Sequence, residues 1–202
     1  VGIKAQRFPQ AVLPGDYPDP SILRDGKDYY MTHSPFYYAP GFLIWHSTDL
    51  MRWEPVCRAL PEYEGSAMAP DLLKYQGRYY IYYPTSTGEN YVIYADDIRG
   101  PWSRPVKLDV RGIDPGHVVG EDGKRYLFTN NGWITPLSDD GLKVTGKSRK
   151  VYDGWKYPAN WVTEGKDMYL ESPKLLYKDG YYYMMSAEGG TAGPATSHMC
   201  VV

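Results

Sequence analysis

Acidic residues stand beside prolines at four places in the chain, and together they could form a site for acid–base chemistry or for cation binding. The four segments are Asp19-Pro20, Pro70-Asp71, Asp114-Pro115 and Glu171-Ser172-Pro173. Taken singly, an acid next to a proline is a common turn former. Recurrence at one place in a repeat predicts carboxylates that converge, and carboxylates that share a partly dry site raise one another's pKa.

The elements that position these acids are predicted to be β-hairpins, because the same pattern follows each acid. An apolar strand leads through a short turn containing glycine into a strand rich in aromatic residues. The turn glycines are Gly26, Gly77, Gly123 and Gly180, which lie 51, 46 and 57 residues apart. Asp25, Asp122 and Asp179 precede three of these glycines. The dipeptide Asp-Gly favours a type I′ turn, in which both residues have positive φ.

A second pair of strands is predicted after the hairpins, for example over residues 42–47 and 53–60, and again over 91–95 and 102–108. Four short strands in a repeat of about 50 residues are typical of a β-propeller blade. The fourth repeat reaches its third strand near the last residue, which would leave an edge that natural sheets avoid. We therefore expect an all-β fold in which residues 1–202 form one domain, with about four blades of a five-bladed β-propeller.

Composition agrees with strands and excludes some classes of protein. The chain has 22 Lys and Arg against 24 Asp and Glu, a net charge of −2 that argues against a nucleic-acid binder. It contains 21 Tyr, 21 Gly and 17 Pro, which favour strands and tight turns. No apolar run approaches the roughly 20 residues of a membrane-spanning helix. Cys57 and Cys200 define no disulfide framework, and their pairing stays open.

Further short motifs follow one another in order from about residue 11 to the end. They are Tyr17-Pro18-Asp19-Pro20-Ser21, Ser34-Pro35-Phe36, Pro40-Gly41, His46-Ser47-Thr48-Asp49-Leu50 with Trp53, Ala69-Pro70-Asp71, Ile113-Asp114-Pro115, Glu171-Ser172-Pro173-Lys174 and Ala187-Glu188-Gly189-Gly190-Thr191. In this order the motifs resemble glycoside hydrolase family 43, the five-bladed propeller enzymes that include β-xylosidases and α-L-arabinofuranosidases.

The resemblance implies an inverting hydrolase that releases terminal arabinofuranose or xylose from plant cell-wall polysaccharide fragments. It makes Asp19 the base that activates water and Glu171 the acid that protonates the leaving oxygen. Asp114 would be a third carboxylate, which raises the pKa of the acid and orients it. An inverting pair of carboxyl groups needs a separation of about 6.5–9.5 Å, so that the water fits between them.

The resemblance also suggests substrate contacts. Phe36 resembles the aromatic residue that flanks the terminal sugar, and Met68 stands where family members usually carry Trp. Because Met has no flat ring for a sugar to stack on, this wall of the site is predicted to differ. Asp71 is either a further substrate-binding carboxylate or a strand-end residue. Trp155 and Trp161, in the irregular stretch 154–165, are either substrate contacts at the cavity rim or structural residues.

For cofactors and metals, we expect no redox cofactor. The resemblance suggests a hydrated cation or a structural calcium on the propeller axis, with His198 near it; the alternative for His198 is a satisfied core histidine. The expected partner is an oligosaccharide or polysaccharide, with no nucleic acid and no membrane. The expected location is secreted or periplasmic, with the cytoplasm as the alternative.

Other functions stay open at this stage. Met68, and Ser172 where the family usually has Gly, leave room for a non-catalytic carbohydrate-binding propeller. An endo-arabinanase and an exo-galactosidase would use the same carboxylates.

Overall fold

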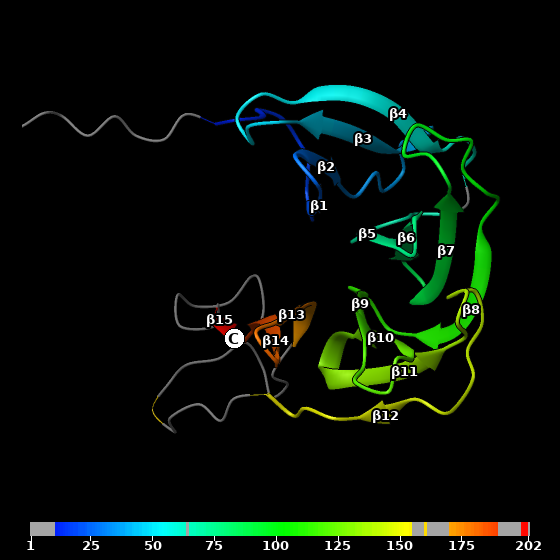
Figure 1. The fold of residues 1–202 in the computed structure, drawn as a ribbon, viewed down its shortest axis with the longest axis vertical. Coiled ribbons are helices and arrows are strands. Elements are labelled where there is room, and N and C mark those ends of the chain that lie inside the picture. Colours follow the sequence, from blue (N-terminus) through cyan, green and yellow to red (C-terminus); the bar gives the residue numbers. More distant parts are fainter. Residues whose placement is uncertain (1–10, 64, 155–159, 161–169, 190–198, 202) are drawn as a thin grey trace, which may run out of the picture.

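The computed structural model describes residues 11–63, 65–154, 160, 170–189 and 199–201. Its strands form four antiparallel sheets that stand around a common centre, as Figure 1 shows. Within each sheet the strands pair in chain order, so each sheet is one blade of a propeller. The prediction of an all-β propeller with about four blades is confirmed.

The blades have the following strands. Blade 1 contains β1 (Ser21–Asp25), β2 (Asp28–Thr32), β3 (Gly41–Ser47) and β4 (Glu54–Leu60). Blade 2 contains β5 (Asp71–Tyr75), β6 (Arg78–Pro84), β7 (Glu89–Ala95) and β8 (Val106–Arg111). Blade 3 contains β9 (Gly116–Val119), β10 (Arg125–Thr129), β11 (Trp133–Leu137) and β12 (Arg149–Lys150), with the 3-10 turn η1 (Asn130–Gly132) before β11. Blade 4 contains β13 (Glu171–Lys178), β14 (Tyr181–Glu188) and β15 (Met199–Val201).

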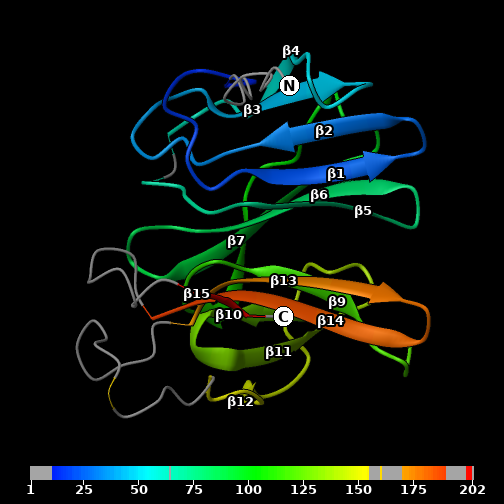
Figure 2. The same cartoon turned by 90° about the vertical axis from the view of Figure 1, so that its left-hand side faces the viewer.

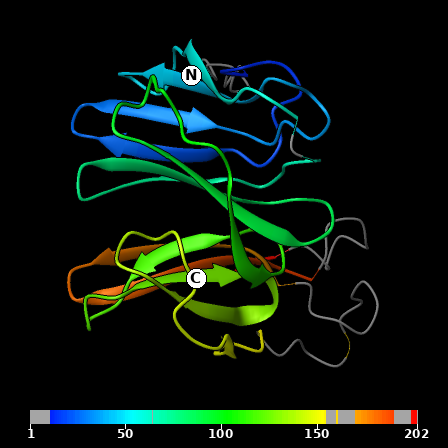
Figure 3. The same cartoon turned by 90° about the vertical axis from the view of Figure 1, so that its right-hand side faces the viewer.

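The inner strand of each blade is its first one. Strands β1, β5, β9 and β13 face the centre in Figure 1, and the last strands of blades 1 to 3 lie outside. Figures 2 and 3 show, from opposite sides, that the inner hairpins of blades 1, 2 and 4 have their turns at one end of the molecule. The starts of these inner strands, where the candidate acids stand, therefore gather at the other end.

The hairpin turns differ from the prediction in two blades. The loops Gln76-Gly77 and Asp179-Gly180 have positive φ at both residues, which is the predicted type I′ pattern. In blade 1 the loop is Gly26-Lys27, because Asp25 is the last residue of β1 and accepts hydrogen bonds from Lys74 and Tyr79 of blade 2. In blade 3 the loop is longer and spans residues 120–124. The prediction of Asp-Gly type I′ turns was wrong at these two places.

Apolar side chains fill the interfaces between neighbouring blades. Phe42 and Ile44 of blade 1 belong to one buried cluster with Ile81 and Tyr83 of blade 2. A second buried cluster joins blades 2 and 3. Its members are Tyr80, Tyr82, Val92, Leu108, Val110, Leu127 and Leu137. Among the described residues there is no helix that is long and apolar enough to cross a membrane.

A buried arginine also closes the interface between blades 2 and 3. The guanidinium of Arg125 lies 4.6 Å from the ring centroid of Tyr75 and 4.4 Å from that of Tyr80. Arg125 donates hydrogen bonds to His117 Nε2 (3.0 Å), to the hydroxyl of Tyr82 (3.0 Å) and to the carbonyl of Asp139 (3.2 Å). Aromatic faces and neutral acceptors thus hold this charge away from water.

Candidate active site

Four residues, one in each blade, share a left-handed backbone conformation directly before a proline. They are Asp19, Ala69, Asp114 and Ser172, with φ of 53°, 39°, 56° and 52°. Positive φ is uncommon outside glycine, and it is often found where a site holds strain. These residues hold equivalent places at the inner strands, so the structure brings Asp19 and Asp114 to the same position in blades 1 and 3.

This register corrects the prediction that all four acids hold one repeat position. Asp71 lies two residues after the left-handed residue of blade 2, and Glu171 lies one residue before that of blade 4. Aligning the four prolines in the sequence would have shown the offset. The four carboxylates therefore stand at three different positions relative to the left-handed residue, and their neighbours differ.

Asp19 is bound through the buried hydroxyl of Ser34. Ser34 Oγ donates to Asp19 Oδ2 at 2.5 Å and accepts a hydrogen bond from the backbone N–H of Ala69 at 2.6 Å. One hydroxyl thus connects the carboxylate of blade 1 to the backbone of blade 2. A hydrogen bond to a carboxylate stabilises its ionised form. Among the described residues no donor binds the other oxygen, Oδ1, and Asp19 as a whole is exposed.

Asp114 binds the left-handed residue of the next blade directly, whereas Asp19 does so through the Ser34 hydroxyl. Its Oδ2 accepts a hydrogen bond from the backbone N–H of Ser172 at 3.0 Å, so blade 3 binds blade 4 beside Glu171. Burial raises the pKa of Asp114, and the charge of Asp19 adds to this effect. The Ser172 N–H and the Lys174 ammonium oppose it. The charge of Asp19 therefore acts on the carboxyl group of Asp114, as expected for carboxylates that converge.

Glu171 is the first residue of β13 and is half-buried. It pairs with Ala187 of β14. The residue before it, Leu170, accepts a hydrogen bond at its carbonyl from the N–H of Asn131 at 2.8 Å. The backbone on both sides of Glu171 is thus bound to blade 3, at Asn131 and at Asp114. The expected effect of Asp114 on the pKa of Glu171 stays a prediction.

Asn130 in η1 fixes the segment that leads to Asp114, and sequence reasoning missed it. Its Oδ1 accepts a hydrogen bond from the N–H of Ile113 at 2.9 Å, and its own N–H donates to the carbonyl of Ile113 at 3.0 Å. Gly112 makes room for this contact, because a Cβ there would lie 2.6 Å from Asn130 Oδ1. Adjacent residues of η1 therefore hold the approaches to Asp114 and to Glu171.

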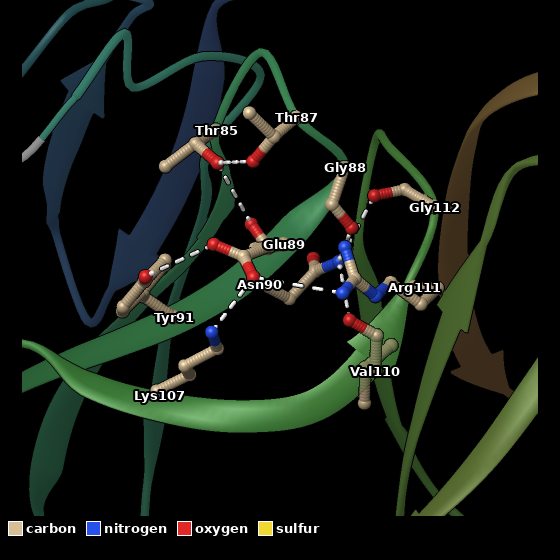
Figure 4. A network of polar contacts seen from close by, with 10 residues as sticks. All are labelled: Thr85, Thr87, Gly88, Glu89, Asn90, Tyr91, Lys107, Val110, Arg111 and Gly112. Carbon is tan, nitrogen blue, oxygen red and sulfur yellow. Dashed lines mark hydrogen bonds and ion pairs between the residues drawn. The ribbon is translucent and has the colours of Figure 1, made fainter.

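The buried side chain of Asn90 also binds the segment before Asp114, at Val110 and Gly112 (Figure 4). Its Nδ2 donates to the carbonyls of Gly112 (2.9 Å), Val110 (3.3 Å) and Gly88 (3.4 Å). These bonds fix the end of β8 and the turn before β7. Asn90 and Asn130 together leave the backbone before Asp114 little freedom, which is the support that a strained site needs.

Asp71 has protein donors on both oxygens. The backbone N–H of His117 donates to Oδ2 at 2.8 Å, and Lys174 Nζ donates to Oδ1 at 3.2 Å. Burial lowers the pKa of His117 to about 4, so this imidazole is neutral near pH 7. Of the two interpretations of Asp71, these contacts favour the strand-end residue that joins blades.

Phe36 and Met68 lie at the same end of the molecule as Asp19. The N–H of Phe36 donates to the carbonyl of Ala67 at 3.0 Å, and the N–H of Met68 donates to that of Pro84 at 3.0 Å. Phe36 lines a cavity of about 340 Å³ together with Tyr17, Ser34 and other residues of blade 1. Their contacts with a sugar stay predictions.

Three predicted site residues, Trp155, Trp161 and His198, lie outside the described residues. Within the part of the chain that the structure describes, no group of three or more His, Cys, Asp and Glu side chains is arranged to hold a metal ion. Cys57 is a free thiol, and its Sγ donates to the carbonyl of Ile98 at 3.4 Å.

Comparison with known proteins gives the same family in sequence and in structure. The model of the glycosyl hydrolases family 43 matches residues 8–201. A xylosidase/arabinosidase of Butyrivibrio fibrisolvens is 34% identical over 90% of this chain and 38% of its own length. A xylan 1,3-beta-xylosidase of a Vibrio species is 36% identical over 89% of this chain and 38% of its own length.

Solved structures that carry the same family name also superpose on this chain. A mutant of the GH43 protein BlXynB from Bacillus licheniformis superposes with a TM-score of 0.80 at 33% identity, over 96% of this chain and 40% of that one. The GH43B protein of a Bacteroides ovatus xyloglucan locus gives a TM-score of 0.80 at 29% identity, again over 96% and 40%. The chain thus spans about 40% of the length of these relatives.

Proposed function

Because this chain belongs to glycosyl hydrolase family 43, we propose that it supplies the reacting carboxylates of an inverting glycosidase. The enzyme would release terminal arabinofuranose or xylose from plant cell-wall polysaccharide fragments. One observation carries the proposal: Asp19 and Asp114 hold the same left-handed position in two blades, close enough for the charge of Asp19 to raise the pKa of Asp114. Strained backbone and crowded like charges are typical of catalytic sites.

Asp19 is the base in this proposal. The Ser34 hydroxyl binds Oδ2 and stabilises the ionised carboxylate. Oδ1 is left to accept a proton from water, which then attacks the anomeric carbon from the face opposite the leaving group. The carboxylate thus turns water into a nucleophile without itself bonding to the sugar.

Glu171 is the acid, and Asp114 sets its protonation. The Asp114 carboxylate binds the N–H of Ser172, the residue next to Glu171, so a negative charge stands beside the acid. A neighbouring anion raises the pKa of a carboxyl group and keeps it protonated near neutral pH. Glu171 can then donate its proton to the glycosidic oxygen as the bond to the anomeric carbon breaks.

The proposed reaction needs no redox cofactor, because hydrolysis transfers no electrons. The proton that Asp19 takes from water balances the proton that Glu171 gives to the leaving group. The substrate is an oligosaccharide or polysaccharide end that enters along the propeller axis. The proposal concerns the complete domain, with a fifth blade, since the relatives are longer than this chain.

The test is hydrolysis of aryl α-L-arabinofuranosides, β-D-xylosides and β-D-galactosides by the complete domain. Asp19→Ala and Glu171→Gln should each lower kcat by at least about 10²–10⁴-fold, as expected for positioned acid–base groups. Glu171→Gln should lose least on substrates with good leaving groups, because these need no proton. Glu121→Gln, an exposed glutamate at the hairpin turn of blade 3, is the matched control and should keep its activity.

Near-normal turnover in Asp19→Ala or Glu171→Gln would overturn the assignment. Turnover of a galactoside alone would keep the carboxylates and change the sugar. Binding of arabino- or xylo-oligosaccharides with no turnover of aryl glycosides or longer chains would replace the proposal with a carbohydrate-binding propeller.

A further inference from the structure

The start of β13 departs from regular pairing at the residues that carry the proposed acid. Glu171 lies opposite Ala187 of β14, and Lys174 lies opposite Met185, so the register shifts by one residue between the two pairs. Ser172, inside this bulge, has a φ of 52°. A bulge bends the strand and re-aims a side chain. The direction of the Glu171 side chain therefore depends on the shape of this bulge, and contacts of the bulge with other blades bear on it.

The side chain of Lys174 makes such contacts with two other blades. Its Nζ lies 3.2 Å from Oδ1 of Asp71 and 3.5 Å from the carbonyl of Pro70, both in blade 2. It also donates to the carbonyl of Pro115 in blade 3 at 3.3 Å. One ammonium group thus joins blade 4 to the inner strands of blades 2 and 3, beside the prolines that follow Ala69 and Asp114.

Lys174 differs in this respect from the residues at the same place in the other blades. These are Ser21, Asp71 and Gly116, each two residues after the left-handed position. Ser21 Oγ accepts a hydrogen bond from the N–H of Leu72, and Asp71 accepts one from that of His117, so each binds the next blade. A Cβ at Gly116 would lie 1.9 Å from the carbonyl oxygen of Pro173, so blade 4 approaches blade 3 closely there. The side chain of Lys174, unlike these three, binds the two preceding blades.

We propose that Lys174 is a positioning residue, which ties the bulge to blades 2 and 3 and so sets where Glu171 stands relative to Asp19 and Asp114. The inference rests on the proposed function, because it assigns Lys174 a part in the proton transfer from Glu171. The same Lys174 contacts hold Ser172, which lies in the bulge and whose N–H donates to Asp114 at 3.0 Å. Without Lys174, this segment would keep its backbone bonds to blade 3 at Asn131 and Asp114 and lose the side-chain bonds to Asp71, Pro70 and Pro115.

The chemistry of the side chain suits this role. An ammonium group has three donors, and here it has three acceptors in two blades. Its charge also offsets the negative charge of Asp71, at a salt-bridge distance of 3.2 Å. Methionine fills a similar volume with no donor and no charge, and arginine keeps the charge with a different geometry.

The experiment compares Lys174→Met and Lys174→Arg with wild type in the complete domain, on aryl glycosides with good leaving groups and alkyl glycosides with poor ones. Lys178→Met, at the exposed end of the same strand, is the control. Lys174→Met should lower kcat by about 10–100-fold, the cost of misplacing a reacting group by about 1 Å. KM should change by less than about threefold, and the loss should be larger for poor leaving groups, because these depend on the proton from Glu171.

Lys174→Arg should recover part of the lost kcat, and Lys178→Met should resemble wild type. A kcat of Lys174→Met within twofold of wild type would overturn the inference. An equal loss on good and poor leaving groups would do the same, because it would show a general loss of structure. If Lys174→Met fails to fold, the leaving-group dependence of Lys174→Arg decides in the same way.

Crystal structures of wild type and variant separate this inference from the proposed function. If wild type hydrolyses no glycoside, the proposed function fails, and the contact between Ser172 N and Asp114 Oδ2 still tests Lys174. Loss of that contact in Lys174→Met, or in Lys174→Arg if the first does not fold, supports the positioning role. A contact that stays at 3.0 Å contradicts it.

Discussion

Strands β6 and β14 hold the same place in blades 2 and 4, each directly after a two-residue turn with positive φ. Tyr79, Tyr80 and Tyr82 of β6 therefore correspond to Tyr182, Tyr183 and Met185 of β14. The first three side chains are 7%, 4% and 0% exposed, and the second three are 43%, 43% and 47% exposed. Two strands with similar aromatic sequences thus have very different surroundings.

Strand β6 has a blade on each face. The hydroxyl of Tyr79 donates to Asp25 of blade 1 at 2.6 Å, and its ring lies edge-on to Tyr30 at 6.4 Å between centroids. On the other face, Tyr80 and Tyr82 contact Arg125 of blade 3. In β14, Tyr182 reaches back to blade 3 and donates to the carbonyl of Val119 at 2.9 Å.

Two of the exposed residues of β14, Tyr183 and Met185, lie on the side that corresponds to the next blade. Side chains alternate along a strand, so Tyr183 and Met185 point away from the face of Tyr182. In β6 the equivalent residues, Tyr80 and Tyr82, are those that meet the following blade. The tyrosines of these two strands therefore serve contacts between blades, and a neighbouring blade on each face is what buries those of β6.

The largest difference is expected when the tyrosines at equivalent positions of β6 and β14 are each replaced by alanine. Tyr80→Ala should lower the free energy of unfolding by about 3–5 kcal/mol, as removal of a buried aromatic side chain does. Tyr183→Ala should cost less than about 1 kcal/mol in the 202-residue chain, because its side chain is largely exposed. Urea unfolding of both variants measures the difference. Equal costs would show that Tyr183 is covered in solution, which would contradict the difference in burial between β6 and β14.

The second prediction concerns Arg125, which is buried between blades 2 and 3. Among the described residues, no other blade interface has a buried arginine or lysine. Arg125→Met should cost about 2–4 kcal/mol, because His117 Nε2 and the buried hydroxyl of Tyr82 lose their donor. Arg104→Met, an exposed arginine in the same pair of blades, is the control and should change stability by about 0.5 kcal/mol or less. A similar loss in both variants would show that Arg125 adds no more than surface charge.

Much of the fold could be predicted from sequence because its signals are local. The glycines of the hairpin turns and the strands on either side of them lie within about ten residues of one another, and the aromatic strands follow directly. The places of Asp19 and Asp114 in the repeat are also marked, by the proline after each, whereas their positive φ was seen only in the structure. Contacts over long separations gave no such signal. Lys174 binds Asp71 across 103 residues, and Arg125 is buried only because tyrosines of blade 2 cover it.

The third prediction uses pH to probe the interface between blades 2 and 3. Burial lowers the pKa of His117 from 6.5 to about 4; the Arg125 charge adds to this effect and Asp71 opposes it. The unfolded chain therefore binds a proton that the folded chain excludes, so stability is complete above pH 6.5 and falls as the pH drops towards 4. The slope from this group reaches at most about 1.4 kcal/mol per pH unit.

His117→Gln should remove this part of the pH dependence, because its amide oxygen can still accept from Arg125 and does not titrate. Urea unfolding of both proteins at several values between pH 4 and pH 7 gives the difference in slope. Parallel curves would mean that His117 is protonated in the fold or exposed in solution.

The smallest expected effect is a gain in stability at the candidate site, opposite in sign to the losses at the blade interfaces. Burial and the charge of Asp19 raise the pKa of Asp114, so its ionised form at pH 7 destabilises the fold. Asp114→Asn removes the charge and keeps an oxygen that can accept from the Ser172 N–H. It should raise Tm by about 2–4 °C at pH 7, the shift that roughly 1 kcal/mol produces in a domain of this size. The gain should fade as the pH drops through the raised pKa, because wild-type Asp114 is then protonated as well.

A gain at pH 7 with a large loss of kcat would mean that the Asp114 charge serves catalysis at the expense of stability. A variant less stable than wild type at pH 7 would mean that the contacts of the ionised carboxylate outweigh its burial.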